Sequence, residues 1–117
     1  MKSGTEGVAT SNYGRNLMKE MMLVYDGDQH RYAQIAGHGF RILAEAMEKD
    51  LPYEIKCPSR LICGTKDHAG SCIRYNREWH RKTKIPLKWI EGAGHNSNTD
   101  KPEMINSLLE EFFSNIL

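Results

Sequence analysis

Two residues of this sequence have the types and surroundings needed for acid–base chemistry. Asp67 ends the segment 64–67 (GTKD), and His95 ends the segment 92–95 (GAGH). They are 28 residues apart, about the length of a strand–helix–strand unit. At neighbouring strand ends, the carboxylate would accept a hydrogen bond from the imidazole, fix its tautomer and stabilise the imidazolium that forms on proton uptake. The pair therefore predicts a general base that is supported by an acid.

The segments around these residues predict the elements that would bring them together. Residues 60–64 and 87–90 are short apolar runs with the pattern of buried strands, and residues 70–82 between them form a helix. A crossover of this length favours parallel strands, which place both strand ends at one edge of the sheet. The axes of the strands would then lie about 4.8 Å apart. Two parallel strands leave open edges, so this sheet looks incomplete.

Two helices are expected before this unit. Residues 16–25 carry apolar side chains at i, i+3, i+4 and i+7, on one helical face: Met18, Met21, Met22 and Tyr25. A turn at residues 26–28 separates this helix from a second one over residues 29–49. There Gly37 and Gly39 either weaken the helix by up to about 1 kcal/mol each relative to alanine, or mark close packing.

A last helix is expected to open at residues 100–103. Asp100 and Glu103 have the spacing of a capping box, and Pro102 fits the first turn. Its expected inner face is Ile105, Leu108, Leu109, Phe112 and Ile116. The predicted order is thus helix, helix, strand, helix, strand, helix.

Composition limits the class of protein. The chain has 117 residues, a net charge of +1 and 39% hydrophobic residues, which fits one globular domain or part of one. This charge gives no reason to expect a nucleic-acid or membrane partner. No apolar run approaches the roughly 20 residues that span a bilayer, and the start lacks the apolar segment of a signal peptide. Cys57, Cys63 and Cys72 match no zinc spacing, so we expect reduced, mostly buried thiols in a cytoplasmic protein.

Other residue clusters have simpler interpretations. His30 and His80 lack a ligand partner at i+3 or i+4, and residues 26–28 lack the later ligands of a calcium loop. We therefore expect no metal site and no cofactor. The basic residues between 74 and 84 are interrupted by Glu78, which favours a solvated helix face. Nucleic-acid binding is a weaker alternative, which would require salt-sensitive affinity.

From about Ile55 to Phe113 the sequence resembles the end of the α/β-hydrolase family. The shared features are Gly-x-x-Asp at 64–67, Gly-x-Gly-His at 92–95 and the Asp, Pro and Glu that open the last helix. In that family the chain order is nucleophile, acid, histidine, so the resemblance implies that Asp67 is the triad acid and His95 the general base. It also implies a partial α/β-hydrolase fold, with a parallel sheet of about two strands packed with about four to five helices.

One part of the family pattern is missing. The nucleophile of the family lies in a Gly-x-Ser-x-Gly elbow, which does not occur here, and the glycine-rich oxyanion segment is also absent. A general base without these parts cannot carry out acyl transfer. We therefore expect the carboxy-terminal part of a serine-hydrolase-like esterase that is inactive without a nucleophile-bearing half. The expected divisions are a flexible lead-in (1–14), a helical cap or linker (15–50) and the hydrolase segment (51–117).

The same resemblance suggests where a substrate would lie. His68 adjoins the acid, and Met21 and Met22 would line a small-molecule site if their helix belongs to a cap. The chain is also expected to form a homo-oligomer or to bind a partner chain. The alternative function is a non-catalytic interaction module that uses its exposed sheet edge to pair with itself or a partner.

Overall fold

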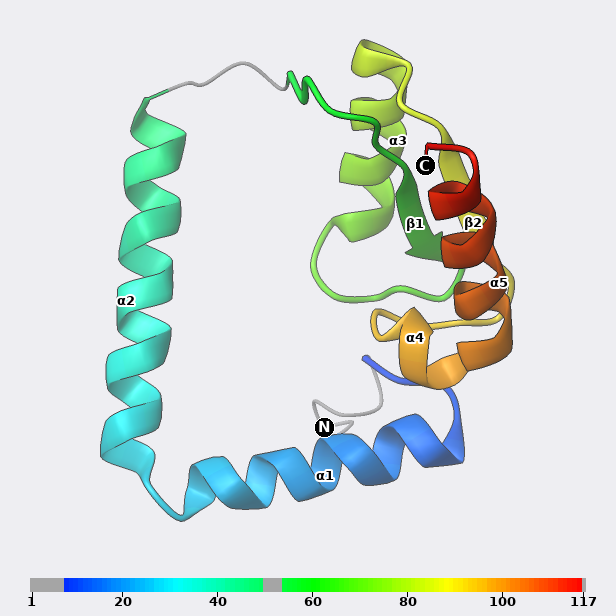
Figure 1. Ribbon diagram of the computed structural model, residues 1–117. Coiled ribbons are helices and arrows are strands. Elements are labelled where there is room, and N and C mark those ends of the chain that lie inside the picture. The colour runs from blue at the N-terminus through cyan, green and yellow to red at the C-terminus, as the bar shows by residue number, and fades with distance from the viewer. Residues whose placement is uncertain (1–7, 50–53, 117) are drawn as a thin grey trace.

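The protein has a mixed α/β structure, as predicted. The computed structural model describes residues 8–49 and 54–116 (Figure 1). In chain order its elements are α1 (Asn12–Asp26), α2 (Gln29–Glu48), β1 (Leu61–Gly64), α3 (Cys72–Thr83), β2 (Leu87–Ile90), α4 (Ser97–Asp100) and α5 (Pro102–Ser114). Within the described residues, no helix is long and apolar enough to cross a membrane.

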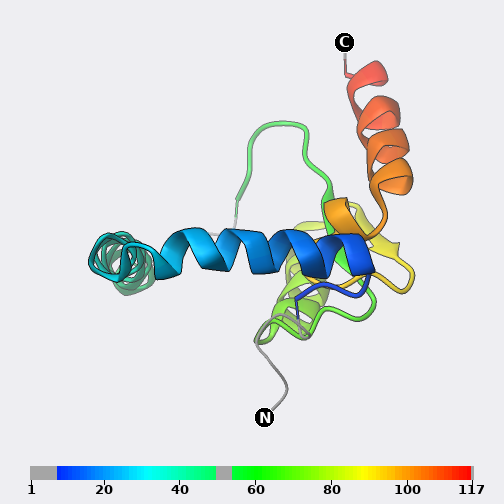
Figure 2. The ribbon, with the colours of Figure 1, turned by 90° about the horizontal axis from the view of Figure 1, so that it is seen from below.

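The two strands form the predicted parallel pair. Leu61 lies opposite Leu87 and Gly64 lies opposite Ile90, with α3 as the connection between the strands. Because side chains alternate along a strand, the sheet has two distinct faces. On one face Trp89 lies under Arg77 of α3, and on the other Ile90 packs with residues of α5. The helices α3 and α5 therefore lie on opposite faces of the sheet (Figures 1 and 2).

The hydrophobic core is small. Within the described residues its main cluster is buried Ile90, Ala93 and Ile105, with Ile62 and Leu108 packed against it, and Ala9 and Cys63 are buried as well. The sequence predicted a longer inner face on the last helix, and this is wrong at its outer positions. Leu109 and Ile116 are 41% and 44% exposed, because a sheet of two strands covers only part of α5.

The N-terminal segment is tied to the loop that follows β2. The N–H of Asn96 donates to the carbonyl of Val8 over 3.0 Å, and the Thr10 hydroxyl donates to the carbonyl of Gly92 over 2.8 Å. Helix α1 begins at Asn12 with Ser11 as its N-cap, earlier than the expected start at residue 16. Residues 1–7 of the expected lead-in lie outside the described residues.

Asp100 fastens this junction instead of capping a helix. Its carboxylate, 8% exposed, accepts hydrogen bonds from the N–H groups of Thr10, Ser11 and Gly94 at 2.8 to 3.0 Å. The predicted capping box is therefore wrong: the N-cap of α5 is Lys101, without a side-chain bond, while Pro102 does occupy the first turn. The short helix α4, which was not predicted, carries Asp100 at its end.

Helices α1 and α2 form an arm, the α1–α2 arm (residues 12–48), that extends away from the sheet (Figures 1 and 2). Helix α2 meets α1 near the turn that joins them, where the ring centroids of Tyr25 and Tyr32 lie 5.0 Å apart, and it has no buried residue (Figure 1). The Cα radius of gyration is 16.3 Å, whereas a compact chain of this length would have about 13 Å. The arm thus leaves the molecule more open than a typical domain of its size.

Candidate functional site

The predicted acid and base are hydrogen-bonded to each other. His95 Nδ1 lies 3.0 Å from Asp67 Oδ2, at the edge of the sheet where both strands end. Asp67 is 6% exposed, and its Oδ1 accepts a hydrogen bond from the N–H of Ala69 over 2.9 Å. With the carboxylate as acceptor, Nδ1 carries the proton and Nε2 keeps its lone pair. The His95 side chain is 45% exposed, so a reactant can reach it.

The two loops that carry this pair are joined by backbone hydrogen bonds. The N–H of Lys66 donates to the carbonyl of Ala93 over 2.9 Å, and the N–H of Gly92 donates to the Thr65 hydroxyl over 2.8 Å. Gly92 has a φ of +74°, which a residue with a side chain adopts only at a cost. A Cβ at Gly64 would overlap the carbonyl oxygens of residues 93 and 94. Glycine at these positions is what lets the two loops touch.

Two thiols lie beside the Asp67 carboxylate. Cys63 Sγ lies 4.0 Å from Asp67 Oδ2, and Cys72 stands in the first turn of α3. Burial raises the pKa of both thiols, and the negative charge of Asp67 raises it further. Both are therefore neutral thiols at pH 7, which argues against either as a nucleophilic thiolate. Cys57 is exposed, contrary to the expectation of mostly buried thiols, whereas Cys63 is buried and Cys72 is partly buried.

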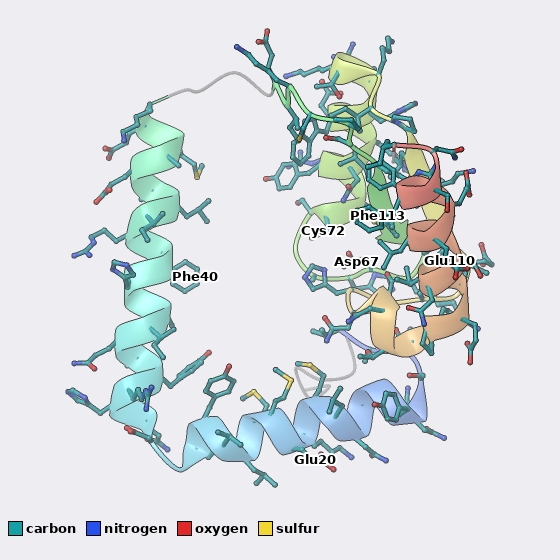
Figure 3. All side chains as sticks on the ribbon, in the orientation of Figure 1. Glu20, Phe40, Asp67, Cys72, Glu110 and Phe113 are labelled. Carbon is teal, nitrogen blue, oxygen red and sulfur yellow. The ribbon has the colours of Figure 1, made fainter. Side chains whose placement is uncertain are left out.

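Cys72 is a neighbour of the pair that the sequence did not indicate. Ligand atoms of Asp67, Cys72 and His95 all lie within 4.8 Å of one another. Figure 3 shows Asp67 and Cys72 close together beside the start of α3. The sequence gives only a weak indication of this proximity. Cys72 follows Asp67 by five residues and is the first residue of α3, whose N-terminus lies on the same side of the sheet as the end of β1.

The residues predicted to bind a substrate lie in different places. His68 is exposed and lines an open hollow of about 890 Å³ beside Asp67, with Arg74 and Arg77 on its α3 side. Met21 and Met22 are on α1 and are 44% and 42% exposed. The methionine that touches the histidine loop is instead Met18, whose sulfur accepts a hydrogen bond from Asn96 over 3.0 Å. Substrate contact by His68, Met21 and Met22 remains a prediction.

Comparison with known proteins gives no relative. No protein-family model, curated protein or solved structure matches this chain. The hydrolase resemblance therefore depends on the two motifs and on the geometry that joins them.

The serine two residues after His95 does not complete a triad. Ser97 is buried, and its hydroxyl donates to the carbonyl of Gly94 over 3.0 Å. It closes the loop of residues 94–97 and is thus a structural residue. By itself the pair can accept a proton at Nε2 and stabilise the resulting imidazolium, which is the work of an acid and a base but not of a nucleophile.

Proposed function

We propose that this chain supplies the acid and the general base of an ester-type α/β-hydrolase, with a nucleophile that comes from outside these 117 residues. The observation that carries the proposal is the 3.0 Å hydrogen bond between His95 Nδ1 and Asp67 Oδ2 at the carboxyl edge of a parallel strand pair. The family's chain order of acid before histidine supports it. On this proposal residues 51–117 are the hydrolase segment and the α1–α2 arm is part of a cap.

Each residue would have a defined role in the reaction. A serine hydroxyl placed against His95 Nε2 would lose its proton to the imidazole as the oxygen attacks the ester carbonyl. His95 would then pass the proton to the leaving alcohol. Asp67 would hold the ring in the productive tautomer and stabilise its positive charge, a contribution of about 10⁴-fold in rate for the acid of a triad. Oxyanion donors would have to come with the nucleophile.

The test combines the full chain with a partner polypeptide that carries a Gly-x-Ser-x-Gly elbow and binds it. A fluorophosphonate probe should label the partner's serine, and a short-chain nitrophenyl ester should be hydrolysed. Both signals should disappear with His95→Ala and persist with His30→Ala, which alters an exposed histidine at the start of α2. Labelling and hydrolysis that survive His95→Ala would overturn the proposal.

A second function is favoured by the exposed apolar side chains of the α1–α2 arm. Phe40 and Met47 are each 72% exposed, and Ile35 is 58% exposed. On this alternative the chain is a non-catalytic interaction module, and partner binding would survive His95→Ala. Within the described residues β1 and β2 have no further strand neighbour, so each strand has an unpaired edge on which a partner strand can pair. A cytoplasmic location remains a prediction, supported by the free thiols.

A further inference from the structure

Three different metal-binding side chains converge at the strand ends. They offer one carboxylate oxygen, one sulfur and one imidazole nitrogen, with all three ligand atoms within 4.8 Å of one another. We propose that Asp67, Cys72 and His95 form a binding site for a zinc ion. The proposal goes beyond the hydrolase function, because it concerns what these side chains bind in the chain alone.

The separations are close to those of a coordinated ion. In a tetrahedral zinc site with bonds of about 2.0 to 2.3 Å, neighbouring ligand atoms lie roughly 3.3 to 3.8 Å apart. Asp67 and His95 are already at 3.0 Å. Cys72 is partly exposed and the His95 side chain is 45% exposed, so both can rotate by the ångström or so that is needed. Asp67 is the fixed member, since it is buried and its Oδ1 is held by Ala69.

The three donor atoms, an oxygen, a sulfur and a nitrogen, favour zinc over other common divalent ions. Magnesium and calcium prefer all-oxygen sites, whereas a thiolate, an imidazole and a carboxylate suit zinc. The Cys72 thiol would release its proton to solvent on zinc binding, and the resulting thiolate and the carboxylate would balance the two positive charges of the ion. The N–H of Ala69 on Asp67 Oδ1 and the Cys63 thiol near Oδ2 provide the outer contacts that orient a ligating carboxylate. Three protein ligands leave a fourth position for water on the exposed side of His95.

Zinc binding and general-base catalysis would exclude each other. The ion would bind His95 Nδ1 in place of its proton, which would pass to Nε2 and remove the lone pair that the proposed triad uses there. It would also bind the Asp67 oxygen that orients the ring. A zinc-loaded chain is thus unable to activate a nucleophile, and zinc removal restores the free pair. The sequence analysis predicted no metal site, because the spacing of these ligands matches no common metal-binding motif. Asp67 and His95 lie in two different loops, and Cys72 lies at the start of α3.

The test uses the full reduced chain without any partner. Titration with Zn²⁺ in a calorimeter should show one ion bound per chain, and Co²⁺ should give a thiolate-to-cobalt charge-transfer band in the near ultraviolet. With Cys72→Ser the band should vanish and zinc affinity should fall by at least roughly ten- to a hundred-fold, since outer-shell losses alone cost this much. With Cys57→Ser, which alters the exposed thiol, both should be unchanged.

A second variant guards against a folding defect in the first. His95→Gln removes a half-exposed ligand and should also abolish high-affinity zinc binding while the circular dichroism spectrum stays the same. Zinc affinity that survives both variants, or a cobalt–thiolate band that depends on Cys57, would overturn the proposal. Because no nucleophile or substrate takes part, failure of the hydrolase proposal would leave this result intact.

Discussion

At the scale of single residues, Gly64 controls the contact between the two loops of the site. A Cβ at this position would overlap the carbonyl oxygens of Ala93 and Gly94, which are backbone atoms and cannot rotate away. Gly64→Ala should therefore push the histidine loop outward and break the bond between Asp67 and His95. We expect a loss of about 1 to 3 kcal/mol in the free energy of unfolding. Urea denaturation and the side-chain NMR signal of His95 Nδ1–H measure the two effects.

Gly37→Ala serves as the control for this variant, because a Cβ there has no heavy atom within 4 Å. The Nδ1–H signal should be unchanged in the control. A Gly64→Ala chain that keeps both the signal and its stability would contradict the close approach of the loops.

Asp100 gives a prediction of how stability depends on pH. Burial alone would raise the pKa of Asp100, but the N–H groups of Ser11, Thr10 and Gly94 outweigh it and lower the pKa to about 2, from an ordinary value of 3.8. The carboxylate thus stabilises the fold above pH 4, and this contribution is lost as the pH falls toward 2. Asp100→Asn should remove about 2 kcal/mol at pH 7 and flatten the dependence between pH 4 and 2.

Chemical denaturation of both proteins at several pH values between 2 and 7 provides the measurement. Asp26→Asn changes an exposed carboxylate and serves as the control. Its free energy of unfolding should depend on pH in the same way as that of the wild type. An Asp100→Asn protein with the same acid-dependent loss as the wild type would show that the junction does not depend on this charge.

At the scale of elements, the sequence predicted the strands and helices whose bounds depend on neighbouring residues in the chain. The strand over 87–90 was predicted with the observed bounds, because an apolar run is flanked there by Pro86 and Glu91-Gly92. The helix α4 and the role of Asp100 could not be predicted in this way. Asp100 binds Thr10, which lies 90 residues away in the chain, and a local capping pattern gives no information on such a contact. Cys72 was missed for the same reason, since its proximity to His95 exists only in the folded chain.

Gly14 is the residue of helix α1 that lies closest to Asp100 at the junction with the rest of the molecule. A Cβ at this buried glycine would lie 2.8 Å from Asp100 Oδ1 and 3.0 Å from Ser11 Oγ. Gly14→Ala should therefore destabilise the junction despite the higher helix propensity of alanine. Gly39→Ala in α2, where a Cβ has no heavy atom within 4 Å, should instead stabilise the chain by up to about 1 kcal/mol.

Thermal unfolding of these two variants compares the same substitution in two helices. We expect the midpoint temperature of unfolding to fall for Gly14→Ala and to rise for Gly39→Ala. A stabilising Gly14→Ala would show that α1 does not pack against Asp100 as described.

At the scale of the whole molecule, the first two helices carry apolar side chains that the described part of the chain leaves exposed. Met21 and Met22, on the apolar face predicted for the first helix, are 44% and 42% exposed, and Ile42 and Leu43 of α2 are 52% and 55% exposed. A pattern of apolar residues predicts that one face of a helix is buried, but it does not predict which surface covers that face. Together with the large radius of gyration, this exposure predicts that the chain associates with itself through the α1–α2 arm.

Phe40 and Phe113 allow a matched test of this association. Phe40 projects from α2 on the side that faces the sheet, is 72% exposed and has little role in the fold, while Phe113 of α5 is 50% exposed (Figure 3). Sedimentation velocity over a range of concentrations should show oligomers that Phe40→Ser weakens and Phe113→Ser does not. Because the contact is apolar, added salt should not dissociate it, unlike a contact made by surface ion pairs. A wild-type chain that stays monomeric at every concentration would contradict the predicted self-association. An oligomer that only Phe113→Ser disrupts would place the contact elsewhere than on the arm.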